Sequence, residues 1–164
     1  MNTIEKIYSN SQSKEDFASA YIKYLTKVLE SISTEEISAF IDMILDARER
    51  NSVVYFIGNG GSAATASHFA NDIAIGTRTY KKPFRIVSLC DNQAVITAIA
   101  NDDGYDKIFS QQLRVLLKKD DVVVAISASG NSPNLLKAME TAKQMEAITV
   151  GLTAFDGGKL KDMV

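Results

Sequence analysis

Four short apolar segments that alternate with longer amphipathic segments restrict the folds this chain can adopt. The apolar segments are rich in β-branched residues and lie at 53–57, 84–89, 122–126 and 148–152. The first, 53–57, is uninterrupted and is followed by a glycine, as is typical of a strand buried on both faces in a parallel sheet. Helical patterns separate and follow them, at about 62–76, 92–100, 106–117 and 133–146. Strands that alternate with helices predict a three-layer αβα sandwich with a parallel sheet.

The first fifty residues carry helical periodicity instead. Apolar residues recur at helix spacing in two segments: Phe17, Tyr21, Tyr24, Leu25, Val28 and Leu29, then Ile37, Phe40, Ile41, Ile44 and Leu45. Ser33 is a suitable N-cap for the second segment. Two amphipathic helices ahead of any strand need a surface to cover, either the sheet or another subunit. We therefore assign 1–50 to N-terminal helices of one domain and 51–164 to its α/β part.

Length and charge exclude several classes of protein. The chain has 164 residues, which suits one domain. Its 18 basic and 20 acidic residues give no basic excess, so a nucleic-acid partner is not expected. No apolar run approaches the roughly 20 residues of a membrane span. Cys90 is the single cysteine and cannot form an internal disulfide, so we expect a cytoplasmic protein without a membrane partner.

Two loops at strand ends are suited to phosphate. Residues 58–62 read Gly-Asn-Gly-Gly-Ser before a helix, where glycines allow close backbone approach and the helix N-terminus favours an anion. Residues 127–133 read Ser-Ala-Ser-Gly-Asn-Ser-Pro, and their hydroxyl groups suit phosphate oxygens. Ser132 is predicted to be the N-cap of the next helix. Each loop alone could be a well-capped turn, but ligands of open α/β sheets bind at this edge.

Further features admit more than one interpretation. His68 and Asp72 are four residues apart on one helix face. They could be an acid–base pair, part of a metal site or a solvated pair on the helix surface. Asn101 and Asp102 belong either to a polar functional loop or to a helix stop. Residues 58–63 also fit the dinucleotide-binding pattern G-x-G-x-x-A, with an acid at 91, although that pattern leaves the serine-rich loop unexplained.

Taken together, these motifs resemble those of the phosphoheptose isomerases in the SIS domain superfamily. The resemblance covers about residues 15–164 and rests on segments 58–62, 68–70, 98–102, 126–132, 151–153 and 156–159. It implies a homotetramer built through the N-terminal helices. It also implies an aldose–ketose isomerase that converts sedoheptulose 7-phosphate to D-glycero-D-manno-heptose 7-phosphate through an enediol. That reaction leads toward heptose in bacterial surface polysaccharide.

The same resemblance implies roles for individual residues. Substrate contacts are expected from Asn59, Gly60, Gly61, Ser62, Asn101 and Asp102, and phosphate contacts from Ser127, Ala128, Ser129 and Ser132. Asp72 stands where the family has its catalytic glutamate, the proposed base. His68 and Asp72 match positions that bind zinc in some members, so zinc is the implied cofactor and no nucleotide cofactor is expected.

Three departures from the family pattern bear on activity. Asp72 is shorter than glutamate by one C–C bond, about 1.5 Å, and a displacement of that order can cost about a hundredfold in rate. Ala128 replaces a threonine and removes a hydroxyl. The sequence ends where a further helix is expected to begin, so the last strand and a helix with a catalytic histidine are expected to be lacking. The alternative is a non-catalytic SIS protein that binds a sugar phosphate or a protein such as the replication initiator.

Overall fold

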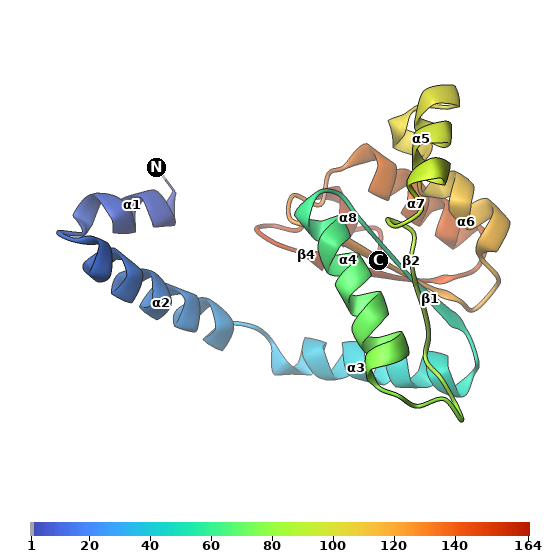
Figure 1. Ribbon diagram of the computed structural model, residues 1–164, viewed down its shortest axis with the longest axis horizontal. Coiled ribbons are helices and arrows are strands. Elements are labelled where there is room, and N and C mark those ends of the chain that lie inside the picture. Colours follow the sequence, from blue (N-terminus) through green and yellow to red (C-terminus); the bar gives the residue numbers. More distant parts are fainter. Residues whose placement is uncertain (1) are drawn as a thin grey trace. The chain divides into compact units, whose positions relative to one another are not determined.

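The computed structural model describes residues 2–164 (Figure 1). The chain divides into two compact units, Met1–Asp42 and Met43–Val164. The first unit holds α1 (Thr3–Asn10), α2 (Lys14–Glu30) and the beginning of α3 (Thr34–Glu49), which continues into the second unit. The helical prediction for this region is therefore confirmed for α2 and α3, whereas α1 was not predicted.

The second unit contains the sheet and its helices. In chain order after α3 they are β1 (Val53–Gly58), α4 (Gly61–Asn71), the π-helical turn η1 (Asp72–Gly76), β2 (Arg85–Ser88), α5 (Gln93–Asp102), the 3₁₀ turn η2 (Tyr105–Lys107), α6 (Ser110–Leu116), β3 (Val122–Ser127), α7 (Pro133–Gln144), β4 (Ile148–Thr153) and α8 (Gly158–Lys161). Every strand predicted from the sequence is present. Two predicted helices differ in detail, because 62–76 ends in η1 and 106–117 begins with η2.

The sheet is parallel throughout, in the order β2-β1-β3-β4. β2, the next strand in the chain, lies on one side of β1, and β3 lies on the other side. The order therefore reverses between β1 and β3. In open α/β sheets a ligand binds at such a reversal, beyond the carboxyl ends of the strands.

The two faces of β1 pack against different helices. Tyr55 and Ile57 belong to a buried cluster with Leu113 of α6 and with Leu135 and Met139 of α7. Phe56 is on the other face, where its ring stacks on Phe69 of α4 at 5.0 Å between centroids. Figure 1 shows α4 on the opposite side of the strands from α6 and α7. The predicted three-layer αβα sandwich is therefore confirmed.

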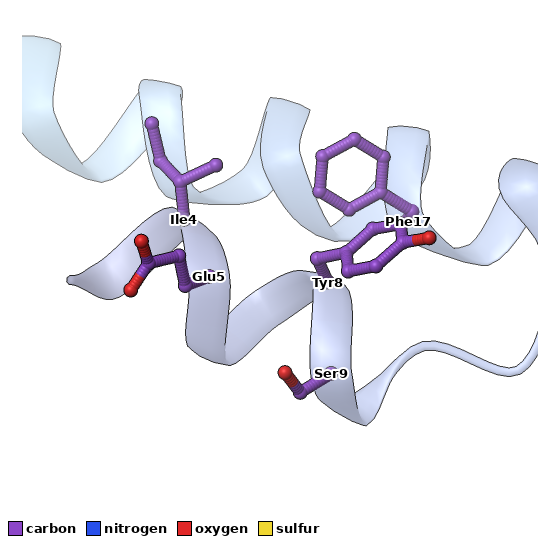
Figure 2. A pocket seen from close by; sticks show the side chains of 5 residues that line it. All are labelled: Ile4, Glu5, Tyr8, Ser9 and Phe17. Carbon is purple, nitrogen blue, oxygen red and sulfur yellow. The ribbon is translucent and has the colours of Figure 1, made fainter. Parts of the chain in front are cut away.

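A pocket in the first unit lies between α1 and α2 and is lined by Ile4, Glu5, Tyr8, Ser9 and Phe17. Figure 2 shows the Tyr8 and Phe17 rings side by side, and their centroids are 5.6 Å apart at a steep angle. Its one ionisable carboxylate, Glu5, accepts a hydrogen bond from the backbone N–H of Asn2. An apolar pocket with a carboxylate at its edge does not suit phosphate. The loops predicted to bind phosphate, at 58–62 and 127–133, lie in the second unit.

Among the helices of residues 2–164, none has both the length and the apolar character that crossing a membrane requires.

Candidate functional site

The two predicted loops meet in one cavity at the reversal of strand order. It has a volume of about 240 Å³. Asn59 and Ser62 line it from the loop after β1, and Ile126, Ser127, Ala128, Ser129, Ser132 and Leu135 line it from β3, its loop and α7. β1 and β3 are neighbours, with Gly58 paired to Ile126 at their carboxyl ends. Six of the residues predicted to bind the substrate or its phosphate thus surround a single space.

The loop after β1 presents open backbone. Gly60 has φ +53°, a conformation that glycine adopts without steric cost. A β-carbon at Gly60 or Gly61 would meet no atom within 4 Å, so the backbone is accessible on that side. Gly58 has the opposite environment, because a β-carbon there would lie 2.7 Å from the Ser62 backbone. Gly58 therefore permits α4 to begin close to the strand, while Gly60 and Gly61 leave room for a ligand.

The serine-rich loop forms a tight turn into α7. The Ser127 hydroxyl accepts the backbone N–H of Gly130 at 3.1 Å. Ser132 is the N-cap residue, as predicted, but its hydroxyl makes no capping hydrogen bond. That hydroxyl therefore remains available to a ligand. The cavity has no charged side chain in its lining, so a phosphate would be held by hydroxyl groups, backbone N–H groups and helix N-termini.

The loop between β4 and α8 supports the serine-rich loop, a contribution that the sequence did not reveal. Backbone N–H groups of Ala154 and Leu160 donate to the carbonyls of Ala128 and Gly130, at 3.3 and 2.9 Å. The Lys159 N–H donates to Asn131 Oδ1 at 3.1 Å. The serine-rich loop is thus held in shape by residues 154–160 before any ligand binds. Segment 156–159 was noted as a family motif, but none of its residues was predicted to act on the site.

The Asn59 side chain is largely committed to protein partners. Its Oδ1 accepts hydrogen bonds from Tyr105 Oη at 3.0 Å and from Asn134 Nδ2 at 2.8 Å. Its Nδ2 donates to Asn134 Oδ1 at 2.9 Å. Asn59 was predicted to contact the substrate, and it does line the cavity. Neither Asn134 nor Tyr105 was predicted to take part.

His68 and Asp72 form a pair away from the cavity. His68 Nε2 lies 2.8 Å from Asp72 Oδ2, with 74% and 58% of the two side chains exposed. The other carboxylate oxygen accepts a hydrogen bond from Asn71 Nδ2 at 3.0 Å. Neither lines the cavity. Asp72 follows the last residue of α4, about 16 Å along the helix axis from Gly61 at 1.5 Å per residue.

Asn101 and Asp102 lie at the end of α5, where Asn101 Nδ2 donates to Asp102 Oδ1 at 2.7 Å. They are exposed and do not line the cavity.

Asp91, the acid of the dinucleotide-binding alternative, accepts a hydrogen bond from the Ser67 hydroxyl of α4. Its carboxylate therefore ties α4 to the segment after β2.

The structure gives limited support for a zinc site. His68 and Asp72 supply two donors, whereas protein zinc sites use at least three protein ligands. Within residues 2–164, no group of three or more His, Cys, Asp or Glu side chains is placed to hold a metal. The residues present therefore do not fit a complete zinc site, and zinc remains a prediction from the family resemblance.

The cavity suits the phosphate ester of a small polar molecule. Four serines line it, Ser62, Ser127, Ser129 and Ser132. The strand order and the position of the cavity are typical of an α/β protein that binds its ligand at the carboxyl edge of the sheet. Comparison with known proteins identifies the class more closely.

The model of the SIS domain family matches residues 17–154. The phosphoheptose isomerase of Helicobacter pylori strain P12 is 38% identical over 144 residues, which are 88% of this chain and 74% of that protein. The solved structure of phosphoheptose isomerase GmhA from Neisseria gonorrhoeae superposes with a TM-score of 0.82 at 33% identity, over 92% of this chain and 80% of that one. A phosphoheptose isomerase from Francisella tularensis gives 0.79 at 28% identity, over 99% and 80%.

These matches place the chain among the SIS domain proteins. Within that class it belongs to the phosphoheptose isomerase family, and it is an aldose–ketose sugar-phosphate isomerase. The resemblance stated from the sequence motifs is therefore confirmed.

Proposed function

We propose that this isomerase interconverts sedoheptulose 7-phosphate and D-glycero-D-manno-heptose 7-phosphate, as a step toward heptose in bacterial surface polysaccharide. The observation that carries the proposal is the cavity between β1 and β3, with four serines and no charged side chain in its lining. Such a cavity binds the phosphate end and leaves the sugar chain to extend beyond it. The names of the relatives at 38% identity support a heptose phosphate as the sugar.

The proposed reaction moves two protons. A carboxylate removes a proton from C1 of the open-chain ketose to give an enediol and returns a proton to C2. A second proton moves from O1 to O2, so the aldose forms without net loss or gain of atoms. We assign the carboxylate to Asp72. His68 Nε2 lies 2.8 Å from Asp72 Oδ2 and orients the carboxylate.

We further propose a homotetramer, because a single chain does not bring Asp72 to its own cavity. Asp72 does not line the cavity and lies about 16 Å along the α4 axis from Gly61. Assembly can place Asp72 of one copy beside the cavity of another. The apolar side chains of α2 support assembly as well: none is buried in the structure, and Ile22 and Leu29 are 62% and 59% exposed.

The decisive experiment is an isomerase assay with sedoheptulose 7-phosphate on wild type and on Asp72→Asn. We expect turnover by the wild type and a loss of at least about a hundredfold in the variant, within the range found when a general base is removed. Asp46→Asn is the matched control, since Asp46 is similarly exposed and also pairs at i,i+4 on a helix, with Arg50 at 2.9 Å.

Each outcome of the assay decides a different point. An active Asp72→Asn variant would refute Asp72 as the base while keeping the reaction. Wild type that binds sedoheptulose 7-phosphate without turning it over would refute the proposed reaction and favour a non-catalytic SIS protein. Sedimentation of the wild type as a monomer under assay conditions would refute the tetramer.

Zinc and compartment are proposed on the resemblance and the composition. We propose that the active protein uses zinc held by His68 and Asp72 together with a donor outside this pair. Metal analysis of the active protein tests this, and full activity in metal-free protein would refute it. We propose the cytoplasm as the compartment, because the single cysteine cannot form an internal disulfide.

A further inference from the structure

A buried amide connects the two sides of the cavity. Asn134 is the second residue of α7 and is only 2% exposed. It is the one polar residue among the largest fully buried side chains, which are otherwise aliphatic or aromatic. Burying an amide in such surroundings is costly unless its hydrogen bonds are made. Its partners therefore indicate why an amide is there.

Asn134 and Asn59 hydrogen-bond to each other through both amide groups. Asn59 Nδ2 donates to Asn134 Oδ1 at 2.9 Å, and Asn134 Nδ2 donates back to Asn59 Oδ1 at 2.8 Å. Asn134 Oδ1 also accepts the backbone N–H of Leu135 at 3.0 Å, which fixes the side chain against its own helix. Tyr105 Oη donates to Asn59 Oδ1 at 3.0 Å from the turn after α5.

This arrangement determines which part of the first loop can meet a ligand. Both lone pairs of Asn59 Oδ1 are used within the protein, so this oxygen has no capacity left for a sugar hydroxyl. The ligand contacts left to the loop are the second Nδ2 hydrogen of Asn59, the side chain of Ser62 and the backbone of Gly60 and Gly61, which is open on one side. Asn59 orients that backbone, and Asn134 holds Asn59.

We propose that Asn134 is a positioning residue for the sugar phosphate, which acts through Asn59 by fixing the loop after β1 at a set distance from the serine-rich loop. This inference rests on the proposed function, because it concerns the same cavity. The two residues are 75 positions apart in the chain: Asn59 lies in the loop after β1, and Asn134 lies in the first turn of α7, after the neighbouring strand β3. Their amide pair therefore joins the loop after β1 directly to α7, the two segments on either side of the cavity.

Only an amide at position 134 satisfies both partners. In Asn134→Asp, one oxygen still accepts from Asn59 Nδ2 and Leu135 N–H, but the other would face Asn59 Oδ1 without a proton to share. Two acceptors at the present 2.8 Å repel each other, so the first loop must move away from α7. A shift of about 1 Å in a substrate-positioning group can lower a rate about a hundredfold.

The test measures the dissociation constant of inorganic phosphate by calorimetry, together with KM, kcat and thermal unfolding. We expect Asn134→Asp to weaken phosphate binding at least about tenfold and to raise KM, since a 1 Å misplacement has effects of that size or larger. Thr141→Val is the matched control on the same helix. Its buried hydroxyl bonds only to the carbonyl of Lys137, at 3.0 Å, and does not line the cavity.

Tyr105→Phe keeps the inference testable if Asn134→Asp does not fold. Tyr105 is 58% exposed, so removing its hydroxyl takes away the hydrogen bond to Asn59 without opening the core. We expect phosphate binding to weaken about fivefold, which corresponds to one net hydrogen bond.

Unchanged phosphate binding in both variants, or the same loss in Thr141→Val at matched stability, would overturn the positioning role. These results are distinct from failure of the proposed function. A wild type that binds phosphate but does not isomerise sedoheptulose 7-phosphate refutes only the reaction. A wild type that isomerises sedoheptulose 7-phosphate but binds no phosphate refutes the positioning role and leaves the reaction standing.

Discussion

Gly130, in the loop after β3, packs directly on Gly157, in the loop after β4. A β-carbon at position 130 would lie 1.8 Å from the carbonyl oxygen of Gly157, far inside any permitted contact. Gly130 also has φ +62°. A second close contact joins the same two segments, because a β-carbon at Gly158 would lie 2.3 Å from the carbonyl oxygen of Ser129. The shape of the serine-rich loop thus depends on two glycine-lined backbone contacts.

Gly130→Ala should therefore damage the cavity. The left-handed conformation costs an alanine about 1–2 kcal/mol, and the clash with Gly157 forces the loop to move. We expect phosphate affinity to fall about a hundredfold, measured by calorimetry, and the thermal midpoint to drop. Gly76→Ala is the control for stability, because its β-carbon would meet nothing closer than 3.8 Å. A Gly130→Ala protein with wild-type phosphate affinity would show that the packing does not shape the site.

Gly61→Ala should separate binding from stability. Gly61 is the first residue of α4, and a β-carbon there has open space around it. Alanine is the better helix former, so we expect the thermal midpoint to stay the same or to rise slightly. Activity should fall at least about tenfold, since the methyl group takes the space through which a ligand approaches the backbone. Full activity in Gly61→Ala would mean that the substrate does not approach this backbone.

The sheet was predictable because its signal is local and repeated. β1 and most of β3 are continuous apolar runs, β2 and β4 are shorter on apolar residues but rich in Ile and Val, and each of the four strands is followed by a helix. The π-helical turn at Asp72–Gly76 was not predictable, since apolar periodicity does not distinguish it from the end of α4. α1 was missed because it has only eight residues. Its one sequence signal is the capping box of Asn2 and Glu5, in which the Glu5 N–H donates to Asn2 Oδ1 at 2.8 Å.

The site was predictable only in part, for a related reason. Glycine and serine composition identified both loops, because turn and hydroxyl chemistry can be read from a few adjacent residues. Asn134 lies directly after Pro133 at the start of a helix, where asparagine is common and exposed. Its burial, and its bond to Asn59, depend on a contact across the sheet that composition does not report. The same holds for the support that residues 154–160 give to the serine-rich loop.

Asp121 should contribute strongly to stability from the edge of the sheet opposite the cavity. It is 4% exposed, and its two oxygens accept the backbone N–H groups of Val53 at 2.8 Å and Lys118 at 2.9 Å. Asp121→Ala leaves both N–H groups unpaired, so we expect a loss of about 3 kcal/mol in the free energy of unfolding, measured with urea. Asp42→Ala, an exposed helix position, should change it by no more than about 0.5 kcal/mol. Equal effects from the two variants would contradict the structural role of Asp121.

The Cys90 thiol should react slowly with disulfide reagents in the native protein. Burial raises its pKa above the ordinary value of 9.0, and Sγ lies 3.5 Å from the carbonyl oxygen of Gly58. Since the thiolate is the reactive form, we expect an aromatic disulfide reagent at pH 8 to react more slowly with native protein than with protein unfolded in urea.

The same shift predicts the direction of a pH effect on stability. The native state disfavours the thiolate, so the contribution of Cys90 is present below pH 9.0 and is lost as the pH rises above it, where the unfolded chain ionises first. Cys90→Ser removes the shifted thiol group and should lessen this loss between pH 8 and 10, followed by urea unfolding. Equal reaction rates for native and unfolded protein, or the same alkaline loss in Cys90→Ser, would contradict the assignment of Cys90 as a half-buried, protonated thiol.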